Sequence, residues 1–135
     1  MSLLKWNDSF FLNIKEIDNQ HKKLVDLINQ LFEAMQQGKA NDVLKGVINE
    51  LVNYTKLHFS LEENYFSKFN FEGKIDHISE HNEFVAKISK FKADFDSGKI
   101  GISIELMRFL SDWLVKHIKG TDKKYVECLK NNGVN

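Results

Sequence analysis

The chain has 135 residues, 42% of them hydrophobic, so it is the size of one domain and can bury a substantial core. Nineteen basic and nineteen acidic side chains give a formal charge of zero, without the basic excess of a nucleic-acid-binding protein or a membrane-surface helix. The apolar runs are too short to span a bilayer, the N-terminus lacks a signal-peptide pattern, and the single cysteine, Cys128, excludes an intramolecular disulfide framework. We therefore expect a cytoplasmic protein with no nucleic-acid or membrane partner.

Residues 1–17 show no helical spacing of apolar side chains, although they contain Trp6, Phe10 and Phe11. We expect this segment to form an extended N-terminal arm that packs over the rest of the protein. Its aromatic side chains are then structural, because they would cover the apolar faces beneath them.

Four later segments carry the 3.6-residue spacing of apolar side chains that is typical of amphipathic helices. The chain has no proline, so glycines mark the breaks between these segments. The predicted helices cover about 19–37, 41–69, 75–97 and 103–131. Short connections between long helices favour antiparallel neighbours. We therefore predict an all-α fold, an antiparallel up-down-up-down four-helix bundle, as a single domain over residues 1–135.

Three polar residues stand where the predicted helices begin and are candidate N-caps. A short polar side chain at that position can accept a hydrogen bond from a backbone N–H of the first turn. The candidates are Asp18, Asn41 and Ser103 for the first, second and fourth helices.

All five histidines lie on the apolar stripes of these helices. A single histidine there is most often a hydrogen-bonded core residue, and the i,i+4 pairs His58/Glu62 and His77/His81 could be simple bonded pairs. Together, however, the helices would gather five imidazoles and at least one carboxylate in one buried place. Without a metal this arrangement has a large desolvation cost, whereas metal binding offsets it. We therefore predict a metal site, with candidate ligands His21, His58, Glu62, His77, His81, His117 and Asp122.

The composition of this set narrows the choice of metal. It exceeds the four ligands of a structural zinc site, and imidazole suits iron, copper, nickel and zinc. Bundle cores hold two-metal carboxylate sites, so a di-iron centre fits the predicted fold. One alternative is that HISEH, residues 77–81, is the H-x-x-E-H motif of inverted zinc peptidases with Glu80 as general base. That alternative leaves the other three histidines buried without a role.

The combined pattern resembles the hemerythrins, and more narrowly the bacterial hemerythrins. It consists of His21, His58-FSL-Glu62, His77-ISE-His81 and His117-IKGT-Asp122. The stretches WNDSFFLNIKEIDNQH and WLVKHIKGTD, which end at His21 and Asp122, are also similar to signatures of that family.

The resemblance implies a role for each candidate ligand. The histidines His77, His81 and His117 would bind one iron, and His21 and His58 would bind the other. The carboxylates Glu62 and Asp122 would bridge the two iron ions, together with an oxo or hydroxo oxygen.

The resemblance also implies a function, because this ligand set leaves one coordination position open on the iron held by His21 and His58. Dioxygen would bind there, in an apolar pocket whose residues would serve equally well as plain core. The expected protein is not an enzyme, but binds dioxygen reversibly for storage, transport or buffering. Two alternatives stay open, a module that senses oxygen, redox state or nitric oxide, and a di-iron enzyme that reduces oxygen, peroxide or nitric oxide. The implied pocket residues are Leu24, Phe59, Trp113, Leu114 and Ile118.

The spacing of the last two candidate ligands does not suit an ideal α-helix. His117 and Asp122 are five residues apart, which is about 500° of helix and leaves them roughly 140° out of line. With Gly120 between them, we predict a loosened or π-bulged turn, a feature common at functional sites.

Overall fold

The structure is a computed structural model that describes residues 10–135, so Trp6 lies outside the described residues. Three long helices come first, and the fourth helical stretch consists of four consecutive pieces. The elements are α1 (Lys15–Gln36), α2 (Ala40–Phe69), α3 (Lys74–Asp96), α4 (Ile102–Trp113), the π-helix η2 (Leu114–Thr121), the 3₁₀-helix η3 (Asp122–Tyr125) and α5 (Val126–Asn131).

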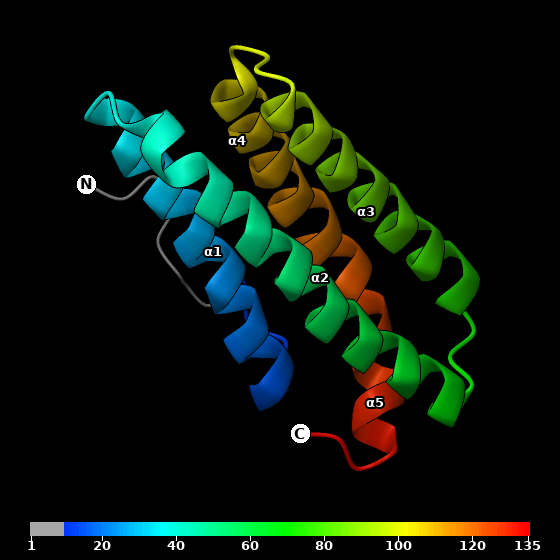
Figure 1. Ribbon diagram of the computed structural model, residues 1–135. Helices are drawn as coiled ribbons and strands as arrows, with labels where there is room; N and C mark the ends of the chain where they lie inside the picture. Colours follow the sequence, from blue (N-terminus) through cyan, green and yellow to red (C-terminus); the bar gives the residue numbers. More distant parts are fainter. Residues whose placement is uncertain (1–9) are drawn as a thin grey trace.

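The helices form an antiparallel bundle, which confirms the predicted all-α fold. Helix α1 packs against α2 and α4, and α3 packs against the same two helices. The α1–α2 and α3–α4 turns lie at one end of the bundle, and the α2–α3 turn and the C-terminus lie at the other (Figure 1). Helices α2 and α4 therefore run in one direction, and α1 and α3 in the opposite direction.

Glycines allow the tight turns at the first of these ends. Gly38 follows α1 with φ of 71°, and Gly101 precedes α4 with φ of 79°. Such left-handed values are strained for residues with a Cβ atom, so glycine is the residue that suits both positions.

The start of α1 corrects the predicted extent of the arm. The helix begins at Lys15, so residues 15–17 belong to α1, with the preceding Ile14 in an extended conformation. Ile14 and Ile17 are buried in a cluster with Phe66 of α2. This packing favours the early helix start, although the arm sequence lacks a helical period of its own.

The predicted N-caps are wrong. The residues that precede α1, α2 and α4 are Ile14, Lys39 and Gly101, and none of them makes a side-chain capping bond. Asp18 lies inside α1, where its Oδ1 accepts a hydrogen bond of 2.9 Å from the backbone N–H of Leu12. This carboxylate fixes the arm against α1 instead of capping the helix.

Two apolar clusters fill the interior. The larger runs through all four helices towards the α1–α2 turn, and it includes Phe10 of the arm. The smaller joins Leu12, Ile14 and Ile17 to Phe66, Tyr125 and Leu129. Burial of each large apolar side chain stabilises the fold by about 1.5–3 kcal/mol relative to exposure.

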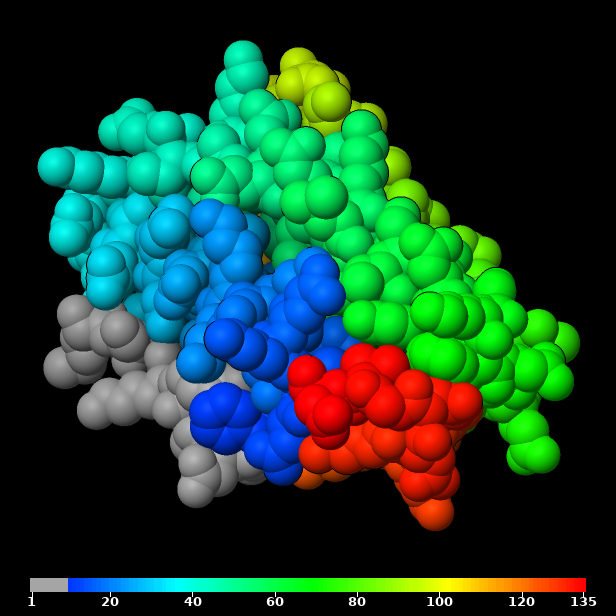
Figure 2. Space-filling view, turned by 90° about the horizontal axis from the view of Figure 1, so that it is seen from below, coloured from blue at the N-terminus to red at the C-terminus, as the bar shows by residue number. Residues whose placement is uncertain are grey.

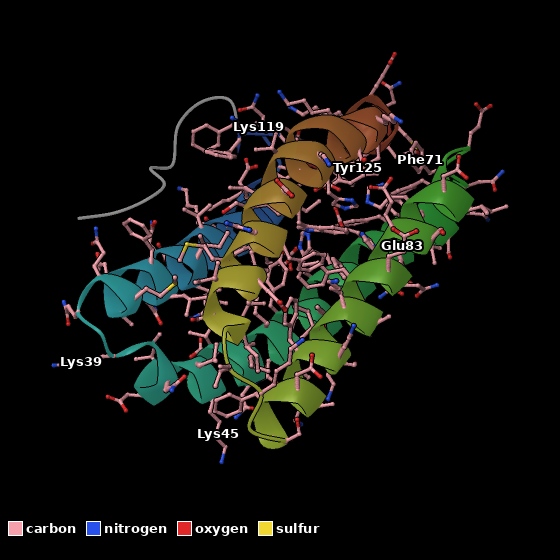
Figure 3. The ribbon with its side chains drawn as sticks, turned by 90° about the horizontal axis from the view of Figure 1, so that it is seen from above. Lys39, Lys45, Phe71, Glu83, Lys119 and Tyr125 are labelled. Carbon is pink, nitrogen blue, oxygen red and sulfur yellow. The ribbon has the colours of Figure 1, made fainter. Side chains whose placement is uncertain are left out.

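The C-terminal segment packs at the end of the bundle that holds the α2–α3 turn (Figure 1). Seen from below, the C-terminal segment lies between the start of α1 and the end of α2 (Figure 2). The side chains of Lys39 and Lys45 point outward, away from the side chains between the helices (Figure 3). No helix within residues 10–135 is long and apolar enough to cross a membrane.

Candidate metal centre

Seven buried polar residues meet between the helices, at the positions that the sequence analysis singled out. Each is at most 2% exposed. Every helical stretch contributes, because the apolar face of each helix is interrupted by histidine or carboxylate at this level. His21 comes from α1, His58 and Glu62 from α2, His77 and His81 from α3, His117 from η2, and Asp122 from η3.

Asp122 lies between two sets of imidazoles, His77, His81 and His117 on one side and His21 and His58 on the other. Its Oδ1 is 2.9 Å from Nε2 of His77 and 3.0 Å from Nε2 of His117. Its Oδ2 is 3.1 Å from Nε2 of His21. The two oxygens of one carboxylate therefore face different histidines, as expected of a group that bridges two ions.

Glu62 occupies a similar position. Its Oε1 is 3.2 Å from Nε2 of His58 and 3.1 Å from Nε2 of His81. On the α1–α2 side, Nε2 of His21 and Nε2 of His58 are 3.1 Å apart. Glu62 is thus close to histidines of both sets.

These short contacts are close approaches, and most of them are not hydrogen bonds. Within residues 10–135, no hydrogen-bond partner is present for either oxygen of Glu62 or Asp122, or for Nε2 of His77, His81 and His117. Buried polar atoms almost always have partners in folded proteins, so this convergence of unpaired atoms fits ligands that share a cation. The atoms form two groups within 4.8 Å, and both groups contain Glu62: Glu62, His77, His81 and His117, and His21, His58, Glu62 and Asp122.

Three of the imidazoles are oriented by hydrogen bonds at their other ring nitrogen. Nδ1 of His81 is 2.9 Å from Glu63 Oε2, and Nδ1 of His117 is 2.9 Å from Glu80 Oε1. Nδ1 of His58 is 2.6 Å from the neutral amide oxygen of Gln20. A bond at Nδ1 fixes the tautomer that leaves Nε2 free to bind a metal.

Glu80 also accepts hydrogen bonds from the hydroxyl of Thr121, at 3.0 and 3.1 Å. The peptidase motif would require this carboxylate as a general base, but here it is engaged by His117 and Thr121. Glu63 is half-buried against His81, whereas Glu83 on α3 is exposed.

Aromatic rings pack against the imidazoles and limit their rotation. Phe59 stacks on His81 with ring centroids 3.8 Å apart, and Trp113 stacks on His117 at 4.0 Å. Tyr54 stacks on His58 at 5.0 Å. These contacts hold the rings in place and exclude water from the cluster.

The proximity of acids and imidazoles shifts their pKa values. Burial lowers the pKa of His77, but the Asp122 and Glu62 carboxylates outweigh burial and raise it to about 9. For His58 burial dominates, and its pKa is lowered. Burial favours the neutral acid of Glu62, yet the nearby imidazoles of His58, His77 and His81 hold its pKa well below the ordinary value.

The five residues that the sequence analysis assigned to an apolar pocket lie in one buried cluster. None is more than 9% exposed. Phe59 contacts Trp113 with ring centroids 6.0 Å apart, and Trp113 stacks on His117. Phe59 and Trp113 therefore contact candidate ligands, and all five residues belong to the larger core cluster: Leu24, Phe59, Trp113, Leu114 and Ile118.

The predicted irregular turn is confirmed, because residues 114–121 form a π-helix followed by a 3₁₀-helix. A π turn holds one more residue than an α turn, so it can bring residues five apart to the same face. This explains how His117 and Asp122 both point into the cluster despite their spacing.

Sequence reasoning did not find the residues that surround the candidate ligands. Gln20 and Glu63 are polar residues on helices that also expose many other polar residues, so no pattern distinguishes them. Glu80 was noticed only as the general base of the peptidase motif, and not as a partner of His117. Tyr54 has one signal, because it lies four residues before His58 and thus shares a helix face with it.

Comparison with known proteins agrees with this geometry. Residues 12–129 match the family described as hemerythrin HHE cation binding domain. The chain is 36% identical over 132 residues to a bacteriohemerythrin of Pseudomonas aeruginosa, a match that covers 98% of this chain and 85% of the relative.

Two further matches cover almost the whole of both chains. A bacteriohemerythrin of Methylococcus capsulatus is 31% identical, with 96% of this chain and 98% of the relative covered. A crystal structure of wild-type hemerythrin superposes with a TM-score of 0.85 at 29% identity, with 95% of this chain and 98% of that chain covered. The chain therefore belongs to the hemerythrin HHE cation-binding family, and it is a homologue of the bacteriohemerythrins.

Proposed function

We propose that this protein is a non-haem di-iron protein that binds dioxygen reversibly, for storage, transport or buffering, and does not act as an enzyme. The observation that carries the proposal is the pair of buried ligand groups that share Glu62. Each group contains at least two imidazoles and one carboxylate, a donor set that suits iron.

The contacts support a division of the ligands between two irons. His77, His81 and His117 would hold one ion, and His21 and His58 the other. Glu62 and Asp122 would bridge them, because each carboxylate approaches histidines of both sets. An oxo or hydroxo group would complete the bridge.

This set would leave one coordination position free. If both irons were octahedral, they would have about twelve positions, and the five imidazoles, the two carboxylates and one shared oxygen would occupy all but one. When bound, the two irons would supply two electrons and this one free position, on the side of His21 and His58.

The residues around that position would control access to it. The apolar side chains of Leu24, Leu114 and Ile118 are at most 1% exposed. We infer that they exclude water and stray protons from a bound gas molecule, together with the rings of Phe59 and Trp113. We expect slow loss of the bound gas as the consequence.

The donor set favours binding over oxidation of a substrate. Carboxylate-rich di-iron proteins of this bundle type use four glutamates and two histidines. Here imidazoles outnumber carboxylates, and fewer anionic ligands stabilise high-valent iron less. The relatives that carry the name bacteriohemerythrin add support for the same function.

The test is a cycle of reduction, oxygenation and evacuation. Iron-loaded protein is reduced without oxygen, exposed to oxygen and then evacuated, while absorption is recorded. We expect a new absorption band that appears with oxygen, disappears under vacuum and returns over several cycles. Continuous oxygen consumption without a stable band would contradict the proposal and favour a di-iron enzyme.

A further inference from the structure

The hydroxyl of Tyr54 is a buried donor without an assigned role. Tyr54 lies on α2 and is 6% exposed, and its hydroxyl oxygen has no hydrogen-bond partner among residues 10–135. Buried hydroxyl groups are normally hydrogen-bonded, so an unpaired one points to a missing acceptor.

Contacts place the ring of Tyr54 beside the candidate metal centre. The ring is nearly parallel to that of His58, with centroids 5.0 Å apart and planes 17° apart. The ring also makes a T-shaped contact with Phe59, with ring centroids 6.2 Å apart. Tyr54 and His58 are four residues apart on α2 and share a helix face, so the ring of Tyr54 lies one helical turn from a candidate ligand.

The surrounding charges agree with this position. Burial raises the pKa of Tyr54 well above its ordinary value, and the negative charges of Glu62 and Asp122 raise it further. Both carboxylates are therefore close enough to act on the Tyr54 hydroxyl.

The topology puts Tyr54 at the same level as the apolar pocket. Tyr54 precedes His58 by one turn of α2, and Leu114 precedes His117 in the parallel fourth stretch. Leu24 follows His21 by about one turn of α1, which runs the opposite way. All three are therefore displaced from the ligands towards the same end of the bundle, and all belong to the larger core cluster.

A second pocket lies on the outer side of the same ring. It has a volume of about 280 Å³ and is lined by Tyr54, His58 and Gln20. Lys23 and Glu50 also line it and form an ion pair, with Nζ and Oε2 2.9 Å apart. Although the side chain of Tyr54 lines this outer pocket, its hydroxyl oxygen is buried and has no partner among residues 10–135.

We propose that the Tyr54 hydroxyl donates a hydrogen bond to the small ligand held beside His21 and His58, and so selects ligands that carry negative charge on the accepting atom. This inference rests on the proposed function. A neutral donor in an apolar pocket strengthens the binding of an anionic acceptor more than that of a neutral one, because little water competes with it. Only a hydrogen bond is involved, and no proton is transferred.

The test compares Tyr54→Phe with the wild-type protein and with Tyr65→Phe. The first variant keeps the stacked ring and removes the hydroxyl. The control removes a hydroxyl from the same helix, on a residue that stacks on Phe69 and is only partly buried. Iron content and the melting temperature of the metal-free protein are measured first, and we expect iron content to be equal in all three proteins.

Azide then serves as the anionic probe for the oxidised, iron-loaded proteins, with its affinity measured from the absorption it induces. We expect Tyr54→Phe to bind azide at least about tenfold more weakly, the loss typical of a hydrogen bond to a charged acceptor, and Tyr65→Phe to match the wild type. The azide stretching frequency should shift in deuterated water in the wild type, and this shift should be absent from Tyr54→Phe.

Equal azide affinities in all three proteins, with the same deuterium shift, would overturn the role of Tyr54 while leaving the di-iron proposal intact. A wild-type protein that takes up no iron pair would overturn the proposed function, and this inference with it. The two failures are therefore distinguishable by the iron content alone.

Discussion

Leu114 lies three residues before His117 in η2, and both side chains are buried. Leu114 is 1% exposed and belongs to the proposed pocket. Leu114→Ala should admit water beside the bound gas, at a folding cost of about 2–5 kcal/mol. We expect the oxygenated spectrum to decay several-fold faster than in the wild type, at a temperature where the variant is fully folded.

Leu44→Ala is the matched control. Leu44 is also 1% exposed, but it lies near the start of α2, more than three turns before His58. It should lose comparable stability and keep the wild-type decay rate. If the two variants decay at the same rate, Leu114 only packs the core and its assignment to the pocket is wrong.

A substitution of Glu80 tests how much a residue that orients a candidate ligand contributes to metal binding. Its carboxylate accepts hydrogen bonds from His117 and Thr121. Glu80→Ala removes the group that orients His117, and such changes typically weaken metal binding 10–100-fold. Iron affinity should fall by about that factor in a competition titration with a chelator.

The control for Glu80 is Glu83→Ala, which removes an exposed carboxylate from the same helix. Its iron affinity should equal that of the wild type. An equal loss of affinity in both variants would mean that the effect is the loss of negative charge on α3, and not the orientation of His117.

At the scale of the element, the π-helix is the feature that makes the last two ligands converge. Gly120 lies within it, but its φ is not positive and an added Cβ would meet no atom within 4 Å. Gly120→Ala should therefore leave iron content unchanged and raise the free energy of unfolding by about 0.5–1 kcal/mol, because alanine loses less entropy in a helix. Chemical denaturation and metal analysis test this. Loss of iron would show that the π turn requires glycine.

The sequence predicted those features of the fold and the site that depend on the spacing of residues along a helix. The apolar stripes of four segments and the positions of five histidines on them were enough for the bundle and the convergence of candidate ligands. The predicted start of the first helix was wrong. The observed start depends on the burial of Ile14 and Ile17 against Phe66, which is distant in sequence. The hydrogen bonds of Gln20 to His58 and of Glu63 to His81 depend on how neighbouring helices are rotated about their axes. No pattern in a single sequence predicts this rotation.

At the scale of the whole molecule, the buried cluster should make the stability of the metal-free protein depend on pH. The pKa of His77 is raised to about 9 by Asp122 and Glu62 despite burial. Between pH 6.5 and 9 the folded chain thus keeps a proton that the unfolded chain has released, so stability falls as pH rises. The pKa of His58 is lowered from 6.5, so its titration affects stability only below pH 6.5.

Urea unfolding of chelator-treated protein at pH 6.5 and pH 9 measures this effect. We expect the free energy of unfolding to fall by up to about 3 kcal/mol at the higher pH. Iron-loaded protein is the control, because its imidazoles would bind metal instead of protons, and it should change much less. A metal-free protein that is equally stable, or more stable, at pH 9 would contradict the proposed charge balance of the cluster.

The most direct test of the central claim, that the two buried groups hold a pair of irons, is the metal content of protein produced with ample iron. We expect about two irons per chain together with iron-dependent charge-transfer absorption, since the proposed ligand set is complete for two ions. His81→Ala should lose both the metal and the absorption. A single tightly bound zinc, with no iron-dependent absorption, would show that the two buried groups do not hold a pair of irons.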